Sequence, residues 1–473
     1  MSKTIIIIGA GLAGLSAALQ AAENGCNVKL VSSLPSERAQ SVMAEGGINA
    51  ALNTKDENDS PEEHFTDTIK AACGLADPNA VWGMTQAAPE LVHWLLKLGV
   101  KFNMSGYDDV DLRNFGGQKK KRTAFAQSDT GKQIMTAMID AVRRKEASGM
   151  VERFSHHSFL TLRLCDNICC GCVIRDEYSQ ETVELPGDAV IVATGGMHGL
   201  FGNTTGSLSN TGEVTAELFR LGVPLANGEM IQYHPTTVKC GGKRMLISEA
   251  ARGEGGRLFA MKDGKQWYFM EEKYPELGNL MPRDITAREI WKVSHESEVF
   301  LDMTEISEEI ISNKLSGLAD DCMTYLHKDI RKEPVSVLPG IHYFMGGILV
   351  DEQHRTPIQN LYAAGECCAQ YHGANRLGGN SLLGALYGGR VAAKSACEQA
   401  DVVDLSCATQ IDFPPASQIS EIKQLNKVMQ ETMGVVRNEN TLLNGIQTVQ
   451  ALTGNLPLLG MAVLKSALAR KES

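Results

Sequence analysis

The sequence predicts an α/β fold built around a parallel sheet. Three observations lead to this expectation: a short β-branched run from Ile5 to Ile8, a glycine-rich turn directly after it, and two strand-like segments, Asp188–Thr194 and Leu361–Ala364, much further along the chain. Both later segments lead into glycine, as the first one does. Strands so far apart in one sheet require a large insertion between them.

The first β-branched run begins a βαβ unit. Its elements are, in order, a strand at Ile5–Ile8, a turn at Gly9–Gly14, a helix at Leu15–Asn24, a turn at Gly25 and a strand at Val28–Ser32. Gly9 permits the tight turn, Gly11 lets the backbone approach a pyrophosphate, and Gly14 lets helix and strand pack closely. The phosphate would lie at the positive N-terminus of the helix. The unit predicts dinucleotide binding, although its second strand ends at Ser32-Ser33 without the acid that usually holds the adenosine ribose.

The predicted insertion runs from about Gln232 to Tyr343 and holds most of the His, Arg and Glu residues of interest. Ligand sites favour such domain interfaces. After about Ser406 the chain is predicted to be mostly helical, with periodic segments at Gln418–Thr432 and Glu439–Leu452. The expected domains are a nucleotide-binding domain at 1–231 and 344–405, a capping domain at 232–343 and a C-terminal helical domain at 406–473.

The composition argues against two classes of partner. A length of 473 residues, with 43% hydrophobic and 21% charged residues, allows two or three domains that each bury a core. The net charge of −11 argues against nucleic-acid binding, and the only basic run, Lys119–Arg122, is expected to be a solvated loop. No uninterrupted apolar run reaches the roughly 18 residues of a membrane-spanning helix, so direct membrane insertion is not expected. Because the net charge of the chain is negative, an anionic substrate would have to be attracted by positive charges close to its binding site.

The N-terminus and the cysteines indicate a cytoplasmic protein. The apolar stretch at Thr4–Ala22 is interrupted by glycines and lacks an A-x-A-like site, so it is interpreted as a folded strand and helix. The twelve cysteines are scattered and lie mostly in apolar stretches, as expected of reduced thiols. The densest group, in a predicted pair of strands at Thr161–Arg175, comprises Cys165, Cys169, Cys170 and Cys172. Its spacing matches neither ferredoxin nor zinc patterns, so neither a metal site nor a second redox centre is expected.

Eight short motifs follow one another along the chain. They are, in order, Ala44–Ala51 (AEGGINAA), Phe115–Gly117 with Arg122-Thr123, Ala193–Gly196, His234–Thr236, Ser248–Gly256, Pro282–Asp284, His342–Gly347 and Ala364–Leu382. In content and order they resemble the succinate dehydrogenase/fumarate reductase flavoprotein family, which also includes L-aspartate oxidase. The similarity runs from about residue 4 to the C-terminus.

The resemblance implies a Rossmann-like FAD-binding domain, an inserted α+β capping domain and a C-terminal helical region. FAD would lie across the large domain with its ring facing the cap. Glu366 would accept hydrogen bonds from ribose hydroxyls, and the backbone around Ser381 and Leu382 would address the flavin ring. The residues implied in FAD binding are Gly9, Gly11, Gly14, Ser32, Ser41, Ala44, Gly46, Gly47, Ala193, Thr194, Gly195, Glu366, Ser381 and Leu382.

A dicarboxylate such as fumarate or succinate is the implied substrate, held between flavin and cap. The implied contacts are Arg376 and His342 at one carboxylate, His234 and Ser248 at the other, and Phe115 and Glu45 nearby. A guanidinium fork meets a carboxylate in bidentate geometry, and imidazoles and a hydroxyl supply further donors. Structural alternatives stay open: the histidines, including His372, could be buried and hydrogen-bonded in place, and Phe115 could be core packing.

The implied mechanism follows from charge. Holding and twisting an enedioate by both carboxylates polarises its double bond, so hydride from the flavin reaches one carbon while carbanion-like charge grows at the other. Arg283 matches the family's proton donor, with Glu249 and Arg252 as its relay. Because the pKa of arginine normally exceeds about 12, this role needs Arg252 to disfavour a second adjacent positive charge and Glu249 to return a proton at once. Otherwise Arg283 is only an electrostatic stabiliser, and Glu249 with Arg252 a helical surface pair.

Three features depart from the family pattern. Gln40 occupies the position of the histidine that binds FAD covalently in membrane-bound members, so we expect non-covalent FAD and a bias toward reduction. Glu45 stands where the family commonly has Gln, and a carboxylate there would repel a dianion unless it is protonated or paired. The chain stops at Ser473, where members usually continue into a small C-terminal domain, so we expect either a truncation or a different docking of the electron partner.

The leading hypothesis is fumarate reduction with electrons from an iron–sulfur protein or another external donor. Met345 and Phe115 favour it, since aspartate oxidases tend to carry Cys and Glu at those positions. L-Aspartate oxidase is the alternative, with Glu45 as a conceivable ammonium partner, and a reductase of another small unsaturated acid is a third. A hypothesis of another class is a non-catalytic electron-transfer subunit, for which a complete dicarboxylate clamp would have no use. We expect a cytoplasmic protein that could attach to a membrane through a partner subunit.

Overall fold

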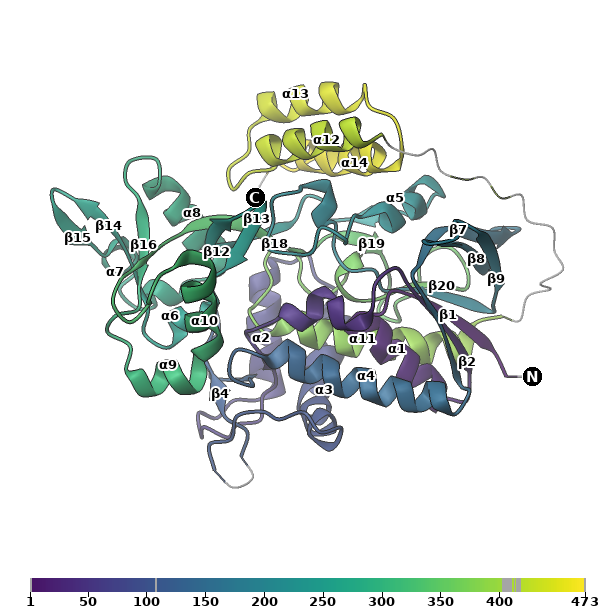
Figure 1. Cartoon of the computed structure of the whole chain (residues 1–473), viewed down its shortest axis with the longest axis horizontal. Helices are drawn as coiled ribbons and strands as arrows, with labels where there is room; N and C mark the ends of the chain where they lie inside the picture. The colour runs from purple at the N-terminus through teal and green to yellow at the C-terminus, as the bar shows by residue number, and fades with distance from the viewer. Residues whose placement is uncertain (1, 107–108, 402–410, 412, 414–417, 472–473) are drawn as a thin grey trace.

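The computed structural model of the protein describes residues 2–106, 109–401, 411, 413 and 418–471. The expected domain boundary between residues 405 and 406 lies outside the described residues. Helices and strands alternate along the chain, and a five-stranded parallel sheet lies in its larger part (Figure 1). The predicted α/β fold is confirmed.

The parallel sheet has the strand order β20-β10-β1-β2-β6. Its strands are β1 (Thr4–Ile8), β2 (Asn27–Ser32), β6 (Val151–Ser155), β10 (Ala189–Val192) and β20 (Leu361–Ala363). Strand β1 pairs with β2 on one side and with β10 on the other. The chain order therefore reverses direction across the sheet at β1 and β10, and such a switch point leaves a crevice at the carboxyl ends of the two strands, where nucleotides bind.

The two faces of the sheet are covered differently. Alternate residues of β1 enter two separate cores, with Ile5 and Ile7 in one and Ile6 and Ile8 in the other, as the two-residue period of a strand requires. The first face is covered by helices α1 (Leu12–Glu23), α4 (Thr130–Ala147) and α11 (Asn380–Gln399). The second is covered by an antiparallel sheet of β7 (His157–Cys165), β8 (Ile168–Asp176) and β9 (Thr182–Pro186), and by α5 (Glu213–Arg220).

The insertion forms a second body with its own hydrophobic core, on the left in Figure 1. Its first and last strands pair with each other at Ile231 and Phe344, so the chain enters and leaves the insertion at one place. The strands are β12 (Ile231–Cys240), β13 (Lys243–Leu246), β14 (Arg257–Lys262), β15 (Lys265–Trp267), β16 (Val299–Asp302), β17 (Val335–Ser336) and β18 (Leu338–Phe344). The helices are α6 (Glu249–Gly253), α7 (Phe269–Lys273), α8 (Arg283–Val293), α9 (Glu308–Lys314) and α10 (Ser316–Asp321).

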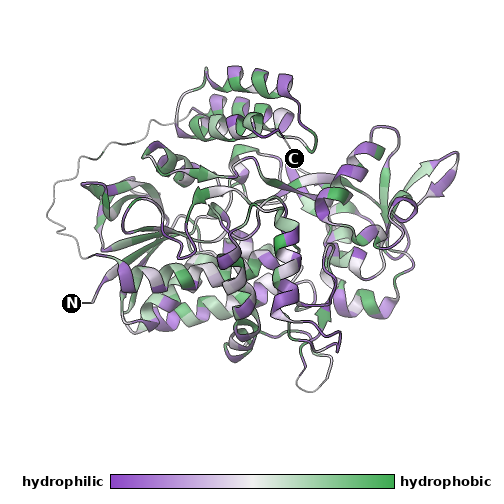
Figure 2. Ribbon diagram, turned by 180° about the vertical axis from the view of Figure 1, so that it is seen from behind, coloured by the Kyte–Doolittle hydropathy of each residue, from purple (hydrophilic) through white to green (hydrophobic). Residues whose placement is uncertain are grey.

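Three helices follow after the described chain resumes at residue 418: α12 (Ile419–Thr432), α13 (Glu439–Val449) and α14 (Asn455–Ala469). Hydrophobic and hydrophilic residues alternate around them (Figure 2). Leu425, Leu442 and Leu459 share one core with Leu200 and Phe201 of the large domain. The two helices that periodicity predicted in this region agree with α12 and α13 to within three residues at each end.

The remaining elements lie beside the parallel sheet. They are α2 (Pro61–Ala72), α3 (Pro78–Lys97), β3 (Ile48–Asn49), β4 (Leu112–Arg113), β5 (Thr123–Ala124), β11 (Leu225–Ala226), β19 (Gly347–Leu349) and β21 (Cys368–Ala369). The N-caps of α2 and α3 are Ser60 and Asp77, whose side chains accept from backbone N–H groups of the first turn.

One residue of the basic run contradicts its prediction as a solvated loop. Arg122 is fully buried and forms ion pairs with Asp59, at 2.8 Å, and with Asp67, at 3.0 Å. Two carboxylates compensate the charge, which is the condition for burying a guanidinium. Lys119 and Lys121 are exposed as expected.

The cysteines agree with their prediction except at one position. Ten described cysteines carry free thiols, including the buried Cys169, Cys170 and Cys172. Cys165 is disulfide-bonded, so the expectation of reduced thiols is wrong there. It ends β7 beside the turn to β8 and is partly exposed, which leaves its sulfur open to pairing. Among the described residues, no group of three or more His, Cys, Asp or Glu side chains is placed to hold a metal ion, and no helix is long and apolar enough to cross a bilayer.

Candidate active site

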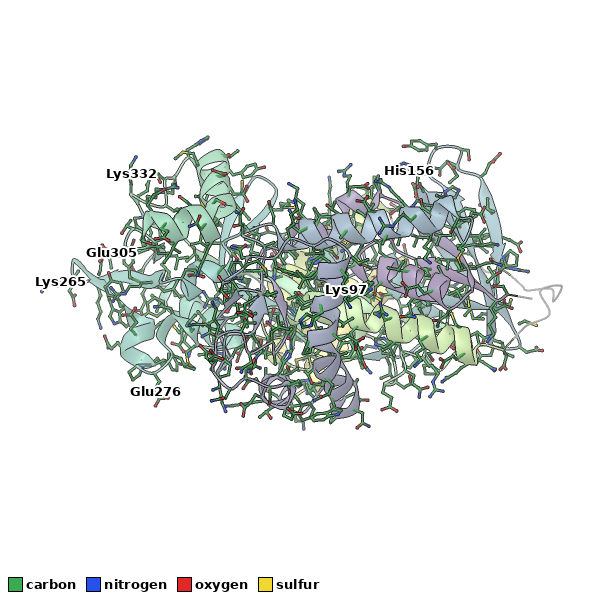
Figure 3. All side chains as sticks on the ribbon, turned by 90° about the horizontal axis from the view of Figure 1, so that it is seen from below. Lys97, His156, Lys265, Glu276, Glu305 and Lys332 are labelled. Carbon is green, nitrogen blue, oxygen red and sulfur yellow. The ribbon has the colours of Figure 1, made fainter. Side chains whose placement is uncertain are left out.

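Most charged side chains point into solvent, as Lys265 and Lys332 do at the edge of the insertion (Figure 3). A few are buried together instead. One such group, separate from that of Arg122, consists of Glu249, Arg252, Arg283 and Arg376, each no more than 6% exposed. Burying a charge is costly unless it is paired, so such a cluster indicates a site and not a surface.

The buried charges lie at one end of a cavity of about 690 Å³. Its walls are the carboxyl ends of β1, β2 and β10, the N-terminus of α11, and strands β12, β13 and β18 of the insertion. The cavity thus lies between the large domain and the insertion, within the size range of small-molecule and cofactor sites.

The residues expected to bind the nucleotide also line the cavity, with one exception. Those that line it are Gly9, Gly11, Ser32, Ser41, Ala44, Gly46, Gly47, Ala193, Thr194, Gly195, Glu366, Ser381 and Leu382. Gly14 lies outside the lining. A Cβ at Gly9 would stand 2.3 Å from the Ala193 carbonyl oxygen, and one at Gly14 would stand 1.8 Å from the Gly9 carbonyl oxygen. Bare backbone therefore forms the cradle that a pyrophosphate needs, and Gly14 supports it through packing.

We expect Gly14→Ala to abolish cofactor binding. The added methyl group would overlap the carbonyl of Gly9 and push the turn out of its place between β1 and α1. The measurement is the flavin absorbance that copurifies with the protein. Gly25→Ala is the control: a Cβ at Gly25 meets nothing within 4 Å, although its φ of +80° still costs some stability. Equal flavin content in both variants would show that Gly14 is not needed for the cradle.

Two polar groups in the cavity wall suit a ribose. The hydroxyl of Ser32, at the end of β2, is buried without a hydrogen-bond partner in the described chain. Glu366 accepts from the backbone N–H of Phe344 at 3.1 Å, and burial raises its pKa to about 7. An orphaned hydroxyl and a carboxyl group with spare acceptor sites are what the hydroxyls of an adenosine ribose and a ribityl chain require.

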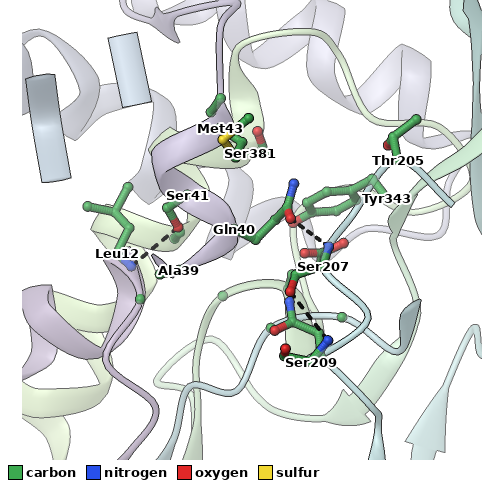
Figure 4. A pocket seen from close by; sticks show the side chains of 18 of the residues that line it. Leu12, Ala39, Gln40, Ser41, Met43, Thr205, Ser207, Ser209, Tyr343 and Ser381 are labelled. Carbon is green, nitrogen blue, oxygen red and sulfur yellow. Dashed lines mark hydrogen bonds between the residues drawn. The ribbon is translucent and has the colours of Figure 1, made fainter. Parts of the chain in front are cut away.

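Gln40 lies in the cavity wall and reaches across to the opposite side (Figure 4). Its side-chain oxygen accepts from the backbone N–H of Ser207 at 2.7 Å. The neighbouring Ser41 hydroxyl accepts from the N–H of Leu12 at 3.4 Å, which ties this loop to the start of α1. An amide is not nucleophilic, so Gln40 contributes hydrogen bonds and no covalent attachment.

The N-terminus of the 20-residue helix α11 points its positive end at the cavity, where Ser381 and Leu382 line the wall. Two hydrogen bonds hold the turn before α11. The side chain of Asn49 donates to the Gly378 carbonyl at 2.8 Å, and the side chain of Gln118 donates to the same oxygen at 2.8 Å. Neither Asn49 nor Gln118 was predicted as a site residue.

Arg283 and Arg376 converge on one amide oxygen. Arg283 is the first residue of α8 in the insertion, and Arg376 lies in the loop before α11 in the large domain. Nη1 of Arg283 and Nη2 of Arg376 each donate to Oε1 of Gln232 at 2.9 Å. Burial, and then the charge of Arg283, lower the pKa of Arg376 to about 9. The Nε of Arg376 is buried without a hydrogen-bond partner among the described residues, so it has a free donor for a ligand.

Glu249 pairs with both neighbouring arginines. Its Oε2 accepts from Nε and Nη2 of Arg283 at 2.8 and 2.6 Å, and its Oε1 lies 3.3 Å from Nη2 of Arg252. The backbone N–H of Gly116 donates to Oε1 at 3.0 Å. Burial raises the pKa of Glu249, but the two guanidinium groups and their hydrogen bonds outweigh it, so the net pKa lies below the ordinary value. Glu249 and Arg283 line the cavity, whereas Arg252 stands behind them.

Gln232 is the residue that sequence reasoning missed at this end. It is 3% exposed, and its side-chain amide also donates to the carbonyl of Arg376 at 2.7 Å. Its only signal in the sequence was its place two residues before His234, at the start of the predicted insertion. It separates two like charges that would otherwise repel.

The expected carboxylate-binding imidazoles lie side by side in the cavity wall, with the rings of His234 and His342 5.2 Å apart. Burial, followed by the charge of Arg283, holds the pKa of both well below the ordinary value. Both are therefore neutral at physiological pH and act as hydrogen-bonding groups, not as fixed charges.

Glu45 and Ser248 both line the cavity, and Ser248 lies close enough to act on the Glu45 carboxyl group. One carboxyl oxygen of Glu45 is buried without a partner in the described residues. Burial, and then the charge of Asp321, raise the pKa of Glu45 to about 8. The group is therefore largely protonated at pH 7, and a neutral carboxyl can donate to a carboxylate instead of repelling it.

Phe115 and His372 have supporting positions. Phe115 is 1% exposed, belongs to the core of the insertion and also lines the cavity, so it packs in the core while its contact with a substrate stays a prediction. His372 does not line the cavity. Its ring lies 5.4 Å from that of Tyr343, over which the Arg376 guanidinium lies at 4.3 Å, so Tyr343 connects His372 to the site.

Comparisons with known proteins agree with this fold. A family model described as FAD binding domain matches residues 4–382. The succinate dehydrogenase flavoprotein subunit of Bacillus subtilis (strain 168) is 40% identical over 97% of this chain and 79% of its own length. The L-aspartate oxidase of Caulobacter vibrioides is 35% identical over 99% of this chain and 91% of its own. A solved structure of E. coli quinol fumarate reductase covers 100% of this chain and 90% of its own with a TM-score of 0.89 and 27% identity.

The fold, the bare-backbone cradle and the family model together define an FAD-dependent oxidoreductase. More narrowly, the chain belongs to the succinate dehydrogenase and fumarate reductase flavoprotein family, and the resemblance of its motifs to that family is confirmed.

Proposed function

We propose that the protein reduces fumarate to succinate, or catalyses the reverse reaction, with FAD bound non-covalently. The observation that carries the proposal is the meeting of Arg283 and Arg376 at Gln232, because it brings a cation from each domain to one place in the cavity. A short diacid is the ligand that such a pair of cations and the neighbouring neutral donors would hold by both ends.

One carboxylate of the substrate would bind Arg376 and His342, and the other would bind His234, Ser248 and the neutral carboxyl of Glu45. Charge balance supports this assignment. Within the cavity the carboxylate of Glu249 is already paired with Arg283, whereas Arg376 forms no ion pair among the described residues and has a free Nε donor. A bound dianion would therefore supply the negatively charged partner that Arg376 lacks.

FAD, when bound, supplies the hydride that reduces one alkene carbon. The chain's own residues must then deliver one proton to the other carbon, and Arg283 is the donor that lines the cavity. Its two contacts with Glu249 at 2.8 and 2.6 Å give a direct path for the proton to be replaced. Two further guanidinium groups lie near it: Nη2 of Arg252 is 3.3 Å from Oε1 of Glu249, and Arg376 shares Oε1 of Gln232 with Arg283.

Gln40 at the family's covalent position supports non-covalent FAD, and the electrons would come from an iron–sulfur protein or another external donor. Several relatives are flavoprotein subunits by name, for example the 8-methylmenaquinol:fumarate reductase flavoprotein subunit of Wolinella succinogenes, which is 31% identical over 100% of this chain and 84% of its own length. We infer that this chain also works with a partner that delivers electrons, and that any attachment to a membrane runs through that partner.

Protonated Glu45 leads to a prediction for the pH dependence. Since its pKa is about 8 in the protein, we expect kcat/KM for fumarate to fall as the pH rises through 8, because the ionised group repels the bound carboxylate. Glu45→Gln should remove this decline and leave a later one near pH 9, where Arg376 loses its charge. Initial rates between pH 6 and 10 measure both. An unchanged profile in the variant would show that Glu45 does not titrate in this range.

Anaerobic turnover distinguishes the candidate functions. With reduced viologen as donor, the purified protein should convert fumarate to succinate, and it should release little peroxide with L-aspartate under air. L-Aspartate oxidation would need a negative partner for the ammonium group, and a protonated Glu45 does not provide one. Peroxide release without fumarate turnover would reverse this order, and turnover of another unsaturated acid alone would change the substrate but not the chemistry. An electron-transfer subunit would show no turnover with any of them.

A further inference from the structure

Thr205 contacts one of the two cavity histidines directly. Its hydroxyl lies 2.8 Å from Nδ1 of His342, and its backbone N–H donates to the carbonyl of Ile341 at 3.0 Å. The residue lies between β10 and α5, outside every motif in the sequence, and it lines the cavity (Figure 4). A side chain from the large domain thus contacts one ring nitrogen of a histidine in the insertion.

The other nitrogen of His342 is open to a ligand. Nε2 makes no hydrogen bond within the described chain, although the residue lines the cavity. A neutral imidazole carries a single N–H, on one nitrogen or the other. A carboxylate only accepts hydrogen bonds, so it binds the tautomer with the proton on Nε2. In that tautomer Nδ1 is an acceptor, so a neighbouring group must donate a hydrogen bond to it.

We propose that the hydroxyl of Thr205 donates to Nδ1 of His342 and so fixes the tautomer that presents Nε2–H to a substrate carboxylate. Thr205 is then a positioning residue for the dicarboxylate clamp. A backbone carbonyl at this place would select the opposite tautomer, with a lone pair turned toward the substrate. The choice of the Nε2–H tautomer rests on the proposed function, because it follows from the substrate carboxylate, whereas the contact between Thr205 and His342 does not.

The second histidine shows why this role is specific. Nδ1 of His234 lies 3.1 Å from the carbonyl, 3.3 Å from the N–H and 3.4 Å from the hydroxyl of Thr236, so both donors and an acceptor of a neighbouring residue surround it. His342 has no such backbone contact in the described residues, and its tautomer depends on one hydroxyl. The segment that carries this hydroxyl is fixed at both ends: Thr204 pairs with His198 at 3.0 Å, and Ser207 donates to Gln40 at 2.7 Å.

The test compares Thr205→Val with Thr205→Ser in the FAD-loaded protein. Valine keeps the shape but removes the donor, whereas serine keeps the donor. Thr85→Val is the matched control, because Thr85 is also buried with a single hydroxyl hydrogen bond but lies on α3, away from the cavity. Flavin content and far-ultraviolet circular dichroism first establish that each variant is folded.

Succinate binding, followed by the perturbation of the flavin spectrum, is the first readout. We expect Thr205→Val to weaken binding about tenfold, the usual effect of losing one buried hydrogen bond, and Thr205→Ser and the control to stay within twofold of the native protein. The second readout is the ¹⁵N spectrum of histidine-labelled protein without substrate, with His342→Gln for assignment. It should show one tautomer in the native protein and in Thr205→Ser, and a mixture in Thr205→Val.

The outcomes separate the two proposals. A fixed tautomer that is lost in Thr205→Val, in a protein that does not bind or reduce dicarboxylates, would reject the proposed function and keep the role of Thr205 toward His342. Native-like succinate binding in Thr205→Val, or an Nδ1–H tautomer in the native protein, would overturn the positioning role and leave the proposed function untouched. Should Thr205→Val fail to fold, the tautomer observed in the native protein and in Thr205→Ser still tests the positioning role of Thr205.

Discussion

Replacing Arg283 with Ala should lower kcat for fumarate by about a thousandfold or more. Two losses add up: the proton donor disappears, an effect of roughly 10²–10⁴, and Glu249 is left in a buried place without its closest partner. Arg283→Lys should recover only part of the rate. It restores the positive charge, but one ammonium group cannot contact both Glu249 and Gln232 as the guanidinium does. Steady-state rates with reduced viologen measure the effect.

Arg288→Ala is the control for this experiment. Arg288 lies on the same helix α8, but its side chain is 46% exposed and pairs with Asp284 on the surface. Such surface pairs contribute little, so both activity and stability should stay near native values. If Arg283→Ala with full flavin content kept kcat within tenfold of the native protein, the proton would have to come from another group.

The second large effect is expected at Arg376. Arg376→Ala should raise the dissociation constant for succinate about a hundredfold, since a charged hydrogen-bonding partner of the carboxylate is lost together with the only guanidinium of the large domain that lines this end of the described cavity. Arg376→Lys should lie in between, because it keeps the charge without the fork. Titration of the flavin spectrum with succinate gives the constants.

Arg390→Ala is the control for Arg376→Ala, because it also removes a guanidinium group. Arg390 lies on α11, stacks on Trp94 at 4.7 Å and does not line the cavity, so we expect native succinate binding. Equal binding by the Arg376→Ala variant and the native protein would mean that the carboxylate is held elsewhere.

Much of the large domain could be predicted from local pattern. The strand at Ile5–Ile8, its glycine turn and the next helix and strand follow from β-branched residues, bare backbone and periodicity, all of which act within a few residues. The motif residues that line the cavity could be named for the same reason: each lies in a short run with a recognisable composition. Their assigned roles remain predictions.

Residues whose function depends on distant partners could not be predicted. Gln232 meets Arg376 across 144 positions of the sequence, and Thr205 meets His342 across 137. Nothing local marks either side chain. Arg122 was misjudged for the same reason, because the carboxylates of Asp59 and Asp67 that allow its burial come from another part of the chain. The neutral state of Glu45 likewise follows only from its surroundings in the fold.

The central claim is that cations and neutral donors from two domains hold both ends of a short diacid in the cavity. Single-turnover reoxidation of the reduced, anaerobic protein tests it most directly, with fumarate compared with crotonate, which has the same double bond but a methyl group in place of one carboxylate. We predict that fumarate reoxidises the protein at least a hundredfold faster than crotonate at equal concentration. Equal rates for the two acids would contradict the claim.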